Sequence, residues 1–590
     1  MVSSMSCTPG SRGGLTSLLI VTLLIVAACD PAEESTRADP NAAADAFIAA
    51  WNDQDTAAMV GAFEATSRES WPAPRLRRLM QVAQRTGAIE DMVIERSGPV
   101  EEPPDAAFEE EGTAPVATVP YTIVYSSEAI LRRIALEGEL SLAYSREADA
   151  WAPQWDQELM WPGHEDAARF AIEYKWLRRG AILDRQGAKL AVGRSESRRY
   201  PRGVVGGITV GHIEPVSKKD LKDHGRAVNA GDLVGASGLE QGLDDVLAGE
   251  PRVLLSVVDR RGRPLDVVGR KRGKPGRDVR TTLDIDVQRA AETAYGSTTG
   301  GAIVMDPKTG DLLAVVSSSP FDPNNYAGVA GIEPFNRALS GLYPPGSSLK
   351  AMTGAAALES NVVKESTPLT GPQEYMGVRN FESGEFGTID FATAVRFSVN
   401  TAFAQVAEDL GARRLTRFAD AFGFNRKPSM PLEAASSSFP FPEDLGDLMW
   451  GSIGQAQVLA TPLQMATIAA TLANDGKRME PRIELRGPKE SERVVSRRTA
   501  AIMTRLMENV VQGGTGTAAN IAGARVAGKT GTAEVDVNGQ RMNHAWFICF
   551  APANDPEVAV AVVSELGGVG GEVAAPLARG ILSSVLPLVR

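Results

Sequence analysis

The chain has 590 residues, of which 43% are hydrophobic and 23% are charged, and its net charge is −12. This composition is typical of globular proteins, and the length exceeds one ordinary domain, so we expect several domains that each bury a core. The acidic balance argues against a nucleic-acid partner, and four scattered histidines with three distant cysteines argue against a metal site. We therefore expect no metal, no cofactor and no nucleic acid.

The N-terminus has the pattern of a bacterial secretion signal. Residues 15–28 (LTSLLIVTLLIVAA) are apolar but short for a membrane span, and a single arginine stands just before them. The run ends in VAAC, which resembles a lipobox, whose cysteine becomes the lipidated first residue. We expect 1–28 to be a lipoprotein signal peptide and Cys29 the lipidation site, with a bare signal peptide or an uncleaved anchor as the alternative. Cys549 would then be a lone thiol, and no intrachain disulfide could form.

Residues 29–40 are polar and contain proline, which is typical of a flexible tether. Residues 41–160 predict a small α+β domain in which the helices come first. Apolar residues recur at helical spacing between residues 44 and 82, and extended runs follow at 116–125 and 134–144.

Residues 161–276 predict a second region, rich in short strands. The segment 177–191 (LRRGAILDRQGAKLA) predicts a strand, an Asp-Arg-Gln-Gly turn and a second strand. The segment 260–280 is dense in Arg, Lys, Gly and Pro, which predicts a solvated linker between domains. A surface for an anionic partner is the alternative for that segment.

Residues 277–590 alternate helices with strands. The pattern predicts a helix that starts within 281–288, another helix at 464–473, a hairpin of 546–551 with 558–563, and a closing helix at 580–588.

The most informative stretch is YPPG at residues 343–346, a turn that leads into an alanine-rich helix. Proline and glycine keep this turn out of the helix, so Ser347 falls in the first helical turn and Lys350 lies one turn further on the same face. The positive end of a helix disfavours an ammonium group and favours a developing oxyanion, so Ser347 is a candidate nucleophile and Lys350 its base. An N-capping serine beside a solvated lysine is the alternative for this motif alone.

Two further motifs follow. Ser398 and Asn400 form an S-x-N at a predicted loop–helix junction, and K-T-G at 529–531 lies on a predicted strand. A second K-T-G, at 308–310, falls in a hairpin turn between apolar runs and precedes the S-x-x-K. We assign no chemistry to this second copy.

S-x-x-K, S-x-N and K-T-G in this order resemble the penicillin-recognising transpeptidases, and more closely their class B branch. The resemblance implies a multidomain α+β and α/β protein, whose C-terminal transpeptidase domain has a central antiparallel sheet flanked by helices. The segment 177–191 is similar to the signature that opens the family's pedestal, or dimerisation, domain. Helices followed by a curved sheet resemble the cone-like, nuclear-transport-factor-like N-terminal domain of the methicillin-resistance type. We place the domain boundaries at 1–28, 29–40, 41–160, 161–276 and 277–590.

The resemblance also implies a role for each motif residue. Lys529 supplies a second cation beside Lys350, and this cation helps burial to lower the pKa of Lys350. Ser398 relays the proton to the leaving amine. Asn400 orients Lys350 and hydrogen-bonds the amide of the substrate.

Backbone N–H groups of Ser347 and Thr532 would form the oxyanion hole. The hydroxyls of Thr530 and Thr532 would hold the terminal carboxylate of the substrate. Gly531 has no side chain, so an extended peptide or a β-lactam can lie against the strand edge.

Two residues depart from the family pattern, because Ala456 and Cys549 stand where glycine is usual. We expect both to affect packing rather than chemistry, although Cys549 could alter access of β-lactams. His544, which follows the K-T-G, is expected to be structural.

The resemblance therefore implies a D,D-transpeptidase that cross-links peptidoglycan stem peptides through an acyl-serine intermediate and is acylated by β-lactams. It implies a lipid-anchored protein on the outer face of the cytoplasmic membrane, with other cell-wall synthesis proteins, such as a glycosyltransferase, as candidate partners. A D,D-carboxypeptidase or β-lactamase, which uses water as acceptor, is one alternative. A non-catalytic β-lactam sensor or cell-wall scaffold is another.

Overall fold

The computed structural model describes residues 37–219, 228–318, 320–328 and 335–589. The predicted signal peptide and Cys29 lie outside these residues. The chain forms two compact units: a first unit of the residues up to Glu128, Arg132–Phe170 and Val257–Leu265, and a second unit of Ala129–Leu131, Ala171–Ser256 and the residues from Asp266 onward. Within the described ranges, no helix has the length and apolar character that a membrane span requires.

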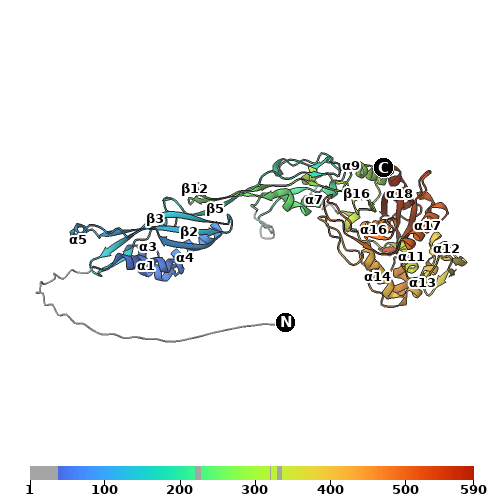
Figure 1. Ribbon diagram of the computed structural model, residues 1–590, viewed down its shortest axis with the longest axis horizontal. Helices are drawn as coiled ribbons and strands as arrows, with labels where there is room; N and C mark the ends of the chain where they lie inside the picture. Colours follow the sequence, from blue (N-terminus) through green and yellow to red (C-terminus); the bar gives the residue numbers. More distant parts are fainter. Residues whose placement is uncertain (1–36, 220–227, 319, 329–334, 590) are drawn as a thin grey trace, which may run out of the picture. The chain divides into compact units, whose positions relative to one another are not determined.

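The first unit packs helices against one face of a four-stranded antiparallel sheet (Figure 1). The helices are α1 (Pro40–Asn52), α2 (Thr56–Ala62), α3 (Ala65–Ser70), α4 (Ala73–Gly87) and the short α5 (Ala106–Glu109). The strands, in spatial order, are β1 (Ile89–Arg96), β2 (Val116–Ser127), β3 (Arg132–Ser145) and β4 (Ala150–Pro153). Alternate residues of β2, from Ala117 to Tyr125, are buried, as expected of a sheet covered on one face. The predicted order of helices and then a sheet is confirmed.

Short strands dominate residues 169–280. They are β5 (Arg169–Lys175), β6 (Ile182–Leu183), β7 (Lys189–Ala191), β8 (Ile213–Pro215), β9 (Leu233–Gly235), β10 (Gly249–Glu250), β11 (Arg252–Val258), β12 (Pro264–Lys271), β13 (Lys274–Pro275) and β14 (Val279–Arg280). The short α-helices α6 (Gly207–Val210), α7 (Gly238–Gly242) and α8 (Asp244–Ala248) lie among them. The predicted strand–turn–strand at 177–191 is confirmed by β6 and β7, and Asp184 holds the turn by accepting from the backbone of Gln186 and Ala188.

The prediction of a linker at 260–280 is wrong. This segment forms β12, β13 and β14, and β12 is an outer strand of a sheet of order β12-β11-β5. Charged side chains are common on edge strands, because they keep the exposed backbone from pairing with other chains. The high charge of the segment therefore marks a strand edge rather than a linker.

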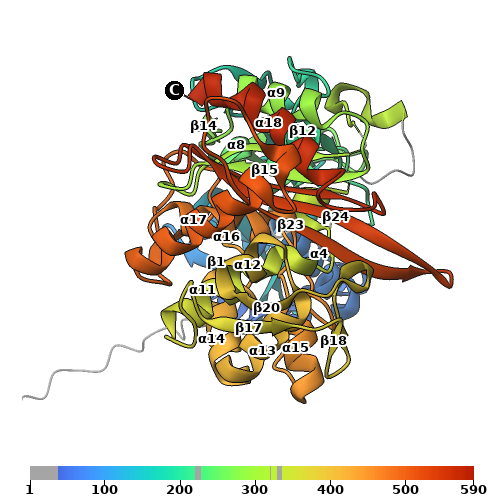
Figure 2. The same ribbon diagram turned by 90° about the vertical axis from the view of Figure 1, so that its right-hand side faces the viewer.

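The second unit is built on a five-stranded antiparallel sheet of order β16-β15-β25-β24-β23 (Figure 2). The strands are β15 (Gly300–Met305), β16 (Leu312–Ser317), β23 (Ala527–Val537), β24 (Gln540–Ala551) and β25 (Val558–Ser564). Helices α9 (Ile285–Tyr295) and α18 (Ala574–Val589) cover one face, and α16 (Pro462–Ala473) and α17 (Arg497–Gly513) lie on the other side. Along β24, Trp546 and Ile548 face one core, while Phe547 and Cys549 face the other.

The remaining elements surround this sheet. They are α10 (Arg337–Ser340), α11 (Lys350–Glu359), α12 (Phe391–Arg396), α13 (Asn400–Leu410), α14 (Ala412–Phe422) and α15 (Leu445–Ser452), with the strand pairs β17 (Pro368–Gly371) and β20 (Gly387–Asp390), β18 (Glu374–Tyr375) and β19 (Val378–Arg379), and β21 (Lys477–Met479) and β22 (Ser491–Arg493). The predicted helices near 285, 464 and 580 and the β24–β25 hairpin are confirmed. The K-T-G at 308–310 lies in the β15–β16 hairpin turn, where Lys308 pairs with Asp555.

Candidate active site

The turn that presents Ser347 is fixed by close backbone contacts. Gly346 adopts φ +52°, and a Cβ at this position would meet the carbonyl oxygen of Thr532 at 2.6 Å. Its N–H donates to the Gly454 carbonyl over 2.8 Å. The indole of Trp546 donates to the Pro344 carbonyl over 2.9 Å. The sequence of this turn is therefore set by packing against the K-T-G strand and the Gly454 loop.

The helix at Ser347 begins differently from the prediction. Residues Gly346–Leu349 form a 3-10 turn, and the α-helix α11 starts only at Lys350. Ser347 still precedes Lys350 by one turn, as predicted, and it is partly exposed while Lys350 is buried. The nucleophile candidate is accessible and its neighbouring amine is not.

The Lys350 amine lies between the two polar residues of the S-x-N motif. Its Nζ donates to the Ser398 carbonyl at 2.8 Å, lies 3.3 Å from Ser398 Oγ and bonds Asn400 Oδ1. Ser398 has φ +58°, a left-handed conformation that serine rarely adopts, and this turns its hydroxyl toward the lysine. Asn400, the first residue of α13, is itself held because its Nδ2 donates to the Arg379 carbonyl over 2.7 Å.

Lys529 reaches the same hydroxyl from β23. Its Nζ lies 2.8 Å from Ser398 Oγ and 3.0 Å from the Thr530 carbonyl. The structure thus brings the three motifs together, with Ser398 Oγ between two lysines, each at most 1% exposed. The hydrogen-bond partners of both amines are neutral oxygens, and no carboxylate of the described residues pairs with either amine to offset the cost of burying its charge.

This environment lowers both pKa values. Burial, and secondarily the charge of Lys529, hold the pKa of Lys350 well below its usual range. Burial lowers the pKa of Lys529 to about 7. Near neutral pH the pair can therefore hold one amine as a free base and the other as a cation, which is what proton transfer through Ser398 requires.

Gly531 serves the packing of the site more directly than the sequence indicated. A Cβ there would lie 2.7 Å from the Pro345 carbonyl and 2.8 Å from the Ser348 nitrogen. Such contacts with backbone atoms cannot be relieved by moving a side chain. The missing side chain lets β23 lie directly against the turn that carries Ser347. Among the strands of the described residues, β23 pairs only with β24, so its other edge is open beside this turn.

The two threonines of the K-T-G strand already have protein partners. Thr530 is buried and its hydroxyl lies 2.6 Å from that of Thr515. Thr532 is partly exposed, and its hydroxyl accepts from the Gly570 nitrogen over 3.2 Å, which leaves its own O–H proton free to be donated. The sequence analysis missed Thr515 and Gly570, although the runs GGTGT at 513–517 and GGVGG at 567–571 signalled close backbone packing.

A second network fixes the start of the nucleophile turn. Glu565 accepts hydrogen bonds from the Tyr343 hydroxyl and from Arg337 Nε. The His544 ring packs edge-on against Tyr343, with centroids 5.3 Å apart, and its Nδ1 accepts from the Leu566 nitrogen over 3.1 Å. These are structural contacts, as expected for His544. Nothing in the sequence around Glu565 indicated this role.

The two departures from the family pattern have separate explanations. Ala456 has φ +56°, a region in which glycine carries no steric cost, so alanine is strained there. Cys549 lies on β24 with its side chain in the core beneath α18, and it is fully buried. Burial raises the pKa of its thiol, so Cys549 is an inert packing residue.

Comparison with protein families locates two known domains in the chain. Residues 300–583 match the penicillin-binding protein transpeptidase domain, and residues 189–281 match the penicillin-binding protein dimerisation domain. The fold and the three motifs therefore define a penicillin-binding transpeptidase.

Individual relatives sharpen this assignment. The chain is 36% identical to the peptidoglycan D,D-transpeptidase PbpA of Mycolicibacterium smegmatis, over 60% of this chain and 80% of that protein. It is 30% identical to MrdA of Acinetobacter baumannii, over 65% of both chains. Among solved structures, PBPA from Mycobacterium tuberculosis matches with a TM-score of 0.57 and 31% identity, covering 69% of this chain and 98% of that one. The chain belongs to the class B penicillin-binding proteins.

Proposed function

We propose that this protein is a peptidoglycan D,D-transpeptidase that cross-links stem peptides through an acyl-serine intermediate. The observation that carries this proposal is the position of Ser398 Oγ, within hydrogen-bonding reach of both Lys350 and Lys529 and beside the turn that presents Ser347. A serine needs a base and a proton path, and this geometry supplies both. The relatives named peptidoglycan D,D-transpeptidase support the same activity.

In the acylation step, Ser347 Oγ attacks the carbonyl carbon of the penultimate D-Ala of the donor peptide. The proton of Ser347 passes to the neutral amine of Lys350. The oxyanion lies between the backbone N–H groups of Ser347 and Thr532, each worth about 3–4 kcal/mol in comparable sites. When the peptide bond breaks, Ser398 gives its proton to the departing D-Ala amine and takes up the proton that Lys350 received from Ser347. Protonated Lys529 keeps the Ser398 hydroxyl oriented.

In the second step, an amine of a neighbouring stem peptide attacks the acyl-serine. It loses a proton along the same path and restores the Ser347 hydroxyl. A β-lactam would acylate Ser347 in the first step as a substrate mimic and block the second. A ceftriaxone acyl-enzyme complex is known for penicillin-binding protein A of M. tuberculosis, which supports β-lactam acylation of Ser347 here.

The donor would lie along the open edge of β23. An extended peptide there pairs with the strand backbone, since Gly531 leaves the edge clear. Asn400 would hydrogen-bond the donor amide as well as orient Lys350. The Thr532 hydroxyl, with its free proton, would hold the terminal carboxylate, and Thr530 would support it from behind.

We further propose the full domain order expected from the sequence. Residues 1–28 are a lipoprotein signal peptide, Cys29 is the lipidated residue, 29–40 are a tether, 41–160 are a nuclear-transport-factor-like domain of the methicillin-resistance type, 161–276 are the pedestal and 277–590 are the transpeptidase domain. The helices and sheet of the first unit support the assignment of residues 41–160. Such a protein would be held on the outer face of the cytoplasmic membrane, where a glycosyltransferase can supply its glycan strands.

The reaction is tested with a synthetic donor peptide ending in D-Ala-D-Ala and an amine acceptor. We expect release of D-Ala together with a new donor–acceptor amide, both absent for Ser347→Ala. Release of D-Ala with hydrolysed donor alone would assign the protein to the carboxypeptidases. Rapid hydrolysis of benzylpenicillin would assign it to the β-lactamases, and acylation without any turnover would indicate a sensor or scaffold.

A further inference from the structure

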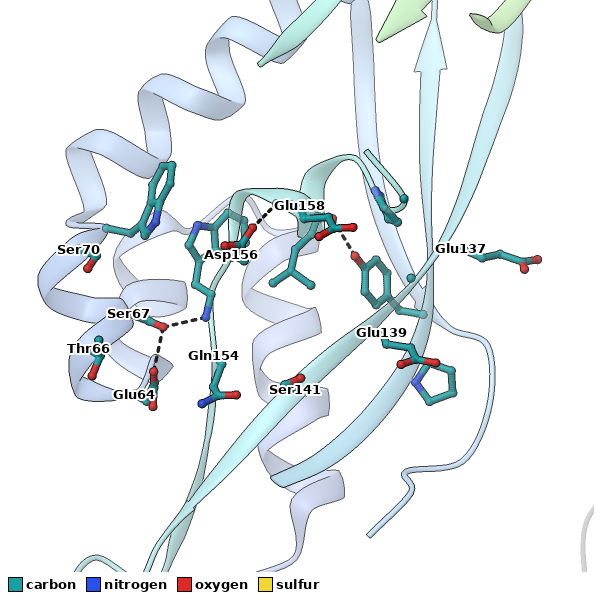
Figure 3. Close-up of a pocket in the computed structure, with 18 of the residues that line it drawn as sticks. Glu64, Thr66, Ser67, Ser70, Glu137, Glu139, Ser141, Gln154, Asp156 and Glu158 are labelled. Carbon is teal, nitrogen blue, oxygen red and sulfur yellow. Dashed lines mark hydrogen bonds between the residues drawn. The ribbon is translucent and has the colours of Figure 1, made fainter. Parts of the chain in front are cut away.

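The first unit contains a pocket of about 950 Å³ that has no part in the reaction described above (Figure 3). Its wall comes from α3 and the residues that flank it, from Ser97, from β2 and β3, and from residues within 154–163 after β4. Five carboxylates line it: Glu64, Glu137, Glu139, Asp156 and Glu158. No basic side chain is among the described residues of its lining. The pocket therefore favours a cationic ligand.

The carboxylates are spread along the pocket rather than gathered at one point. In the described part of the chain, no group of three acidic, histidine or cysteine side chains is arranged to hold a metal ion. Burial raises the pKa of Tyr121, and the negative charge of nearby Glu158 raises it further. Spaced negative charges match a ligand that carries several separate positive charges.

The pocket lies on a strand edge with open hydrogen-bonding groups. β4 covers only residues 142–145 of β3, and the Gln154 nitrogen adds one bond to the Ser141 carbonyl. Along a strand, the backbone N–H and C=O groups of every second residue point to the same edge. Glu137 and Glu139 therefore direct theirs to the same edge of β3 as Ser141. The described residues supply no strand there to pair with them.

The partner strand supports this orientation of Glu139. Pro120 of β2 lies opposite Glu139, and its carbonyl accepts from the Ser97 nitrogen on the β1 side. Proline has no N–H to offer, so no hydrogen bond from Pro120 engages Glu139 across β2 and β3. The backbone of Glu139 is thus free for a strand added at the pocket.

A tryptophan with a buried, unpaired donor also forms part of the pocket wall. Trp155 is 5% exposed and stacks on Phe63, with ring centroids 5.5 Å apart. Its Nε1–H has no acceptor in the described part of the chain. The nitrogen itself is buried, so this unpaired N–H lies behind the pocket wall and is not a contact for a ligand.

We propose that this pocket binds an extended basic segment of a partner protein, which adds to the free edge of β3 as a further strand. Side chains of an added strand point alternately to the two faces of the sheet. Glu137 and Glu139 lie on the face opposite Tyr121. Glu64 directly precedes α3, and Asp156 and Glu158 lie in the segment after β4. Lysine or arginine side chains at alternate positions meet a carboxylate on either side, and the backbone bonds hold the segment in register.

The test uses the full-length protein and a short fluorescein-labelled peptide of alternating lysine and threonine, measured by fluorescence anisotropy at physiological salt. We expect saturable binding by the wild type. The affinity should fall about tenfold in the double variant Glu137→Gln/Glu139→Gln, because each substitution removes a charge contact at the edge of β3. Glu90→Gln/Glu128→Gln is the matched control: it changes the charge of the same unit equally, outside the pocket, and should bind as the wild type does.

Two peptide controls separate strand addition from charge alone. A glutamine-for-lysine peptide and a peptide with alternate backbone nitrogens methylated should both fail to bind. Glu139→Pro removes the outward N–H together with the carboxylate, so it is compared with Glu139→Gln, which removes the charge alone. Glu139→Pro should bind more weakly than Glu139→Gln while preserving Tm and acylation by benzylpenicillin. If Glu139→Pro lowers Tm, the methylated peptide alone decides whether the peptide binds by strand addition.

Equal binding to both charge variants, equal binding of the methylated peptide, or no binding at all would overturn the proposal. Binding of a glucosamine oligomer in place of the peptide would also overturn it, in favour of a glycan site. The proposal is independent of the acyl-serine chemistry, because Ser347→Ala should bind the peptide unchanged. An experiment that refutes peptide binding at the β3 edge can therefore be distinguished from one that refutes the transpeptidase assignment.

Discussion

Lys350 and Lys529 both lie within hydrogen-bonding reach of one hydroxyl, that of Ser398, and burial lowers the pKa of each. The amine of Lys350 must be neutral to accept the proton of Ser347, and Lys529 must be charged to support the leaving group. The acylation rate should therefore increase as pH rises through the pKa of Lys350. It should decrease as pH rises further through the pKa of Lys529. The titration belongs to the pair rather than to either residue.

The alkaline limb can be tested with Lys529→Arg. In the wild type we expect the second-order rate of acylation by a chromogenic β-lactam to fall as pH rises above about 7, the pKa of Lys529. A guanidinium stays charged throughout this range, so the variant should keep its rate at high pH even if its absolute rate is lower. Stopped-flow measurement with a chromogenic β-lactam between pH 5.5 and pH 9 gives both profiles. The same alkaline limb in both proteins would exclude Lys529 as its source.

Ala456 offers a test of backbone strain at the site. At φ +56° a non-glycine residue costs about 1–2 kcal/mol, so Ala456→Gly should raise Tm by about 2 °C without loss of acylation. Ala470→Gly, within the buried helix α16, is the matched control and should lower Tm, because glycine disfavours a helix by about 1 kcal/mol. Differential scanning fluorimetry compares the two. A drop in Tm for both variants would show that Ala456 carries no relievable strain.

At the scale of elements, the site depends on how closely β23 approaches the Ser347 turn. Gly531→Ala places a Cβ against the backbone of Pro345 and Ser348, so we expect the turn to shift and acylation to slow by about 100-fold, as for other small misplacements of reacting groups. In Gly580→Ala, within α18, the new Cβ meets Ala294 at an ordinary 3.6 Å, and helix stability should rise by about 1 kcal/mol. Acylation rates and Tm values measured together would separate the two. Normal acylation by the Gly531→Ala protein would contradict the packing role.

Several elements could be predicted from the sequence because their signals are local. The proline-glycine turn, the alanine-rich helix and the hairpin at 308–310 each follow from residues next to one another. The order of three short motifs then indicated residues that the structure brings together, among them Lys350, Ser398 and Lys529. This worked because each motif lies at an element end, where a few residues decide the geometry.

Other features could not be predicted because they depend on contacts between distant segments. The 3-10 turn at Ser347, the left-handed Ser398 and the strain at Ala456 exist only against neighbours from elsewhere in the chain. Glu565 and Thr515 are ordinary residues in sequence and gain a role through Tyr343 and Thr530. The segment 260–280 was misassigned because the charge of an edge strand resembles that of a linker.

At the scale of the whole molecule, Cys549 reports on the integrity of the second unit. It is fully buried between the sheet and α18, and burial raises the pKa of its thiol. In a protein that starts after Cys29, it is the only thiol, so labelling by a thiol reagent should be negligible in the folded state and should follow unfolding in urea. Rapid labelling without denaturant would show that this core opens locally.

The central claim is that Ser347 is the acylated nucleophile. The most direct measurement is intact-mass analysis of the protein after incubation with benzylpenicillin, followed by peptide mapping, with Ser347→Ala and Ser348→Ala run in parallel. The account predicts one covalent adduct on Ser347 in the wild type and its absence in Ser347→Ala. Ser348→Ala should keep the adduct, because the Ser348 hydroxyl is buried and donates to the Pro345 carbonyl. An adduct that persists in Ser347→Ala, or that maps to another residue, would contradict the mechanism.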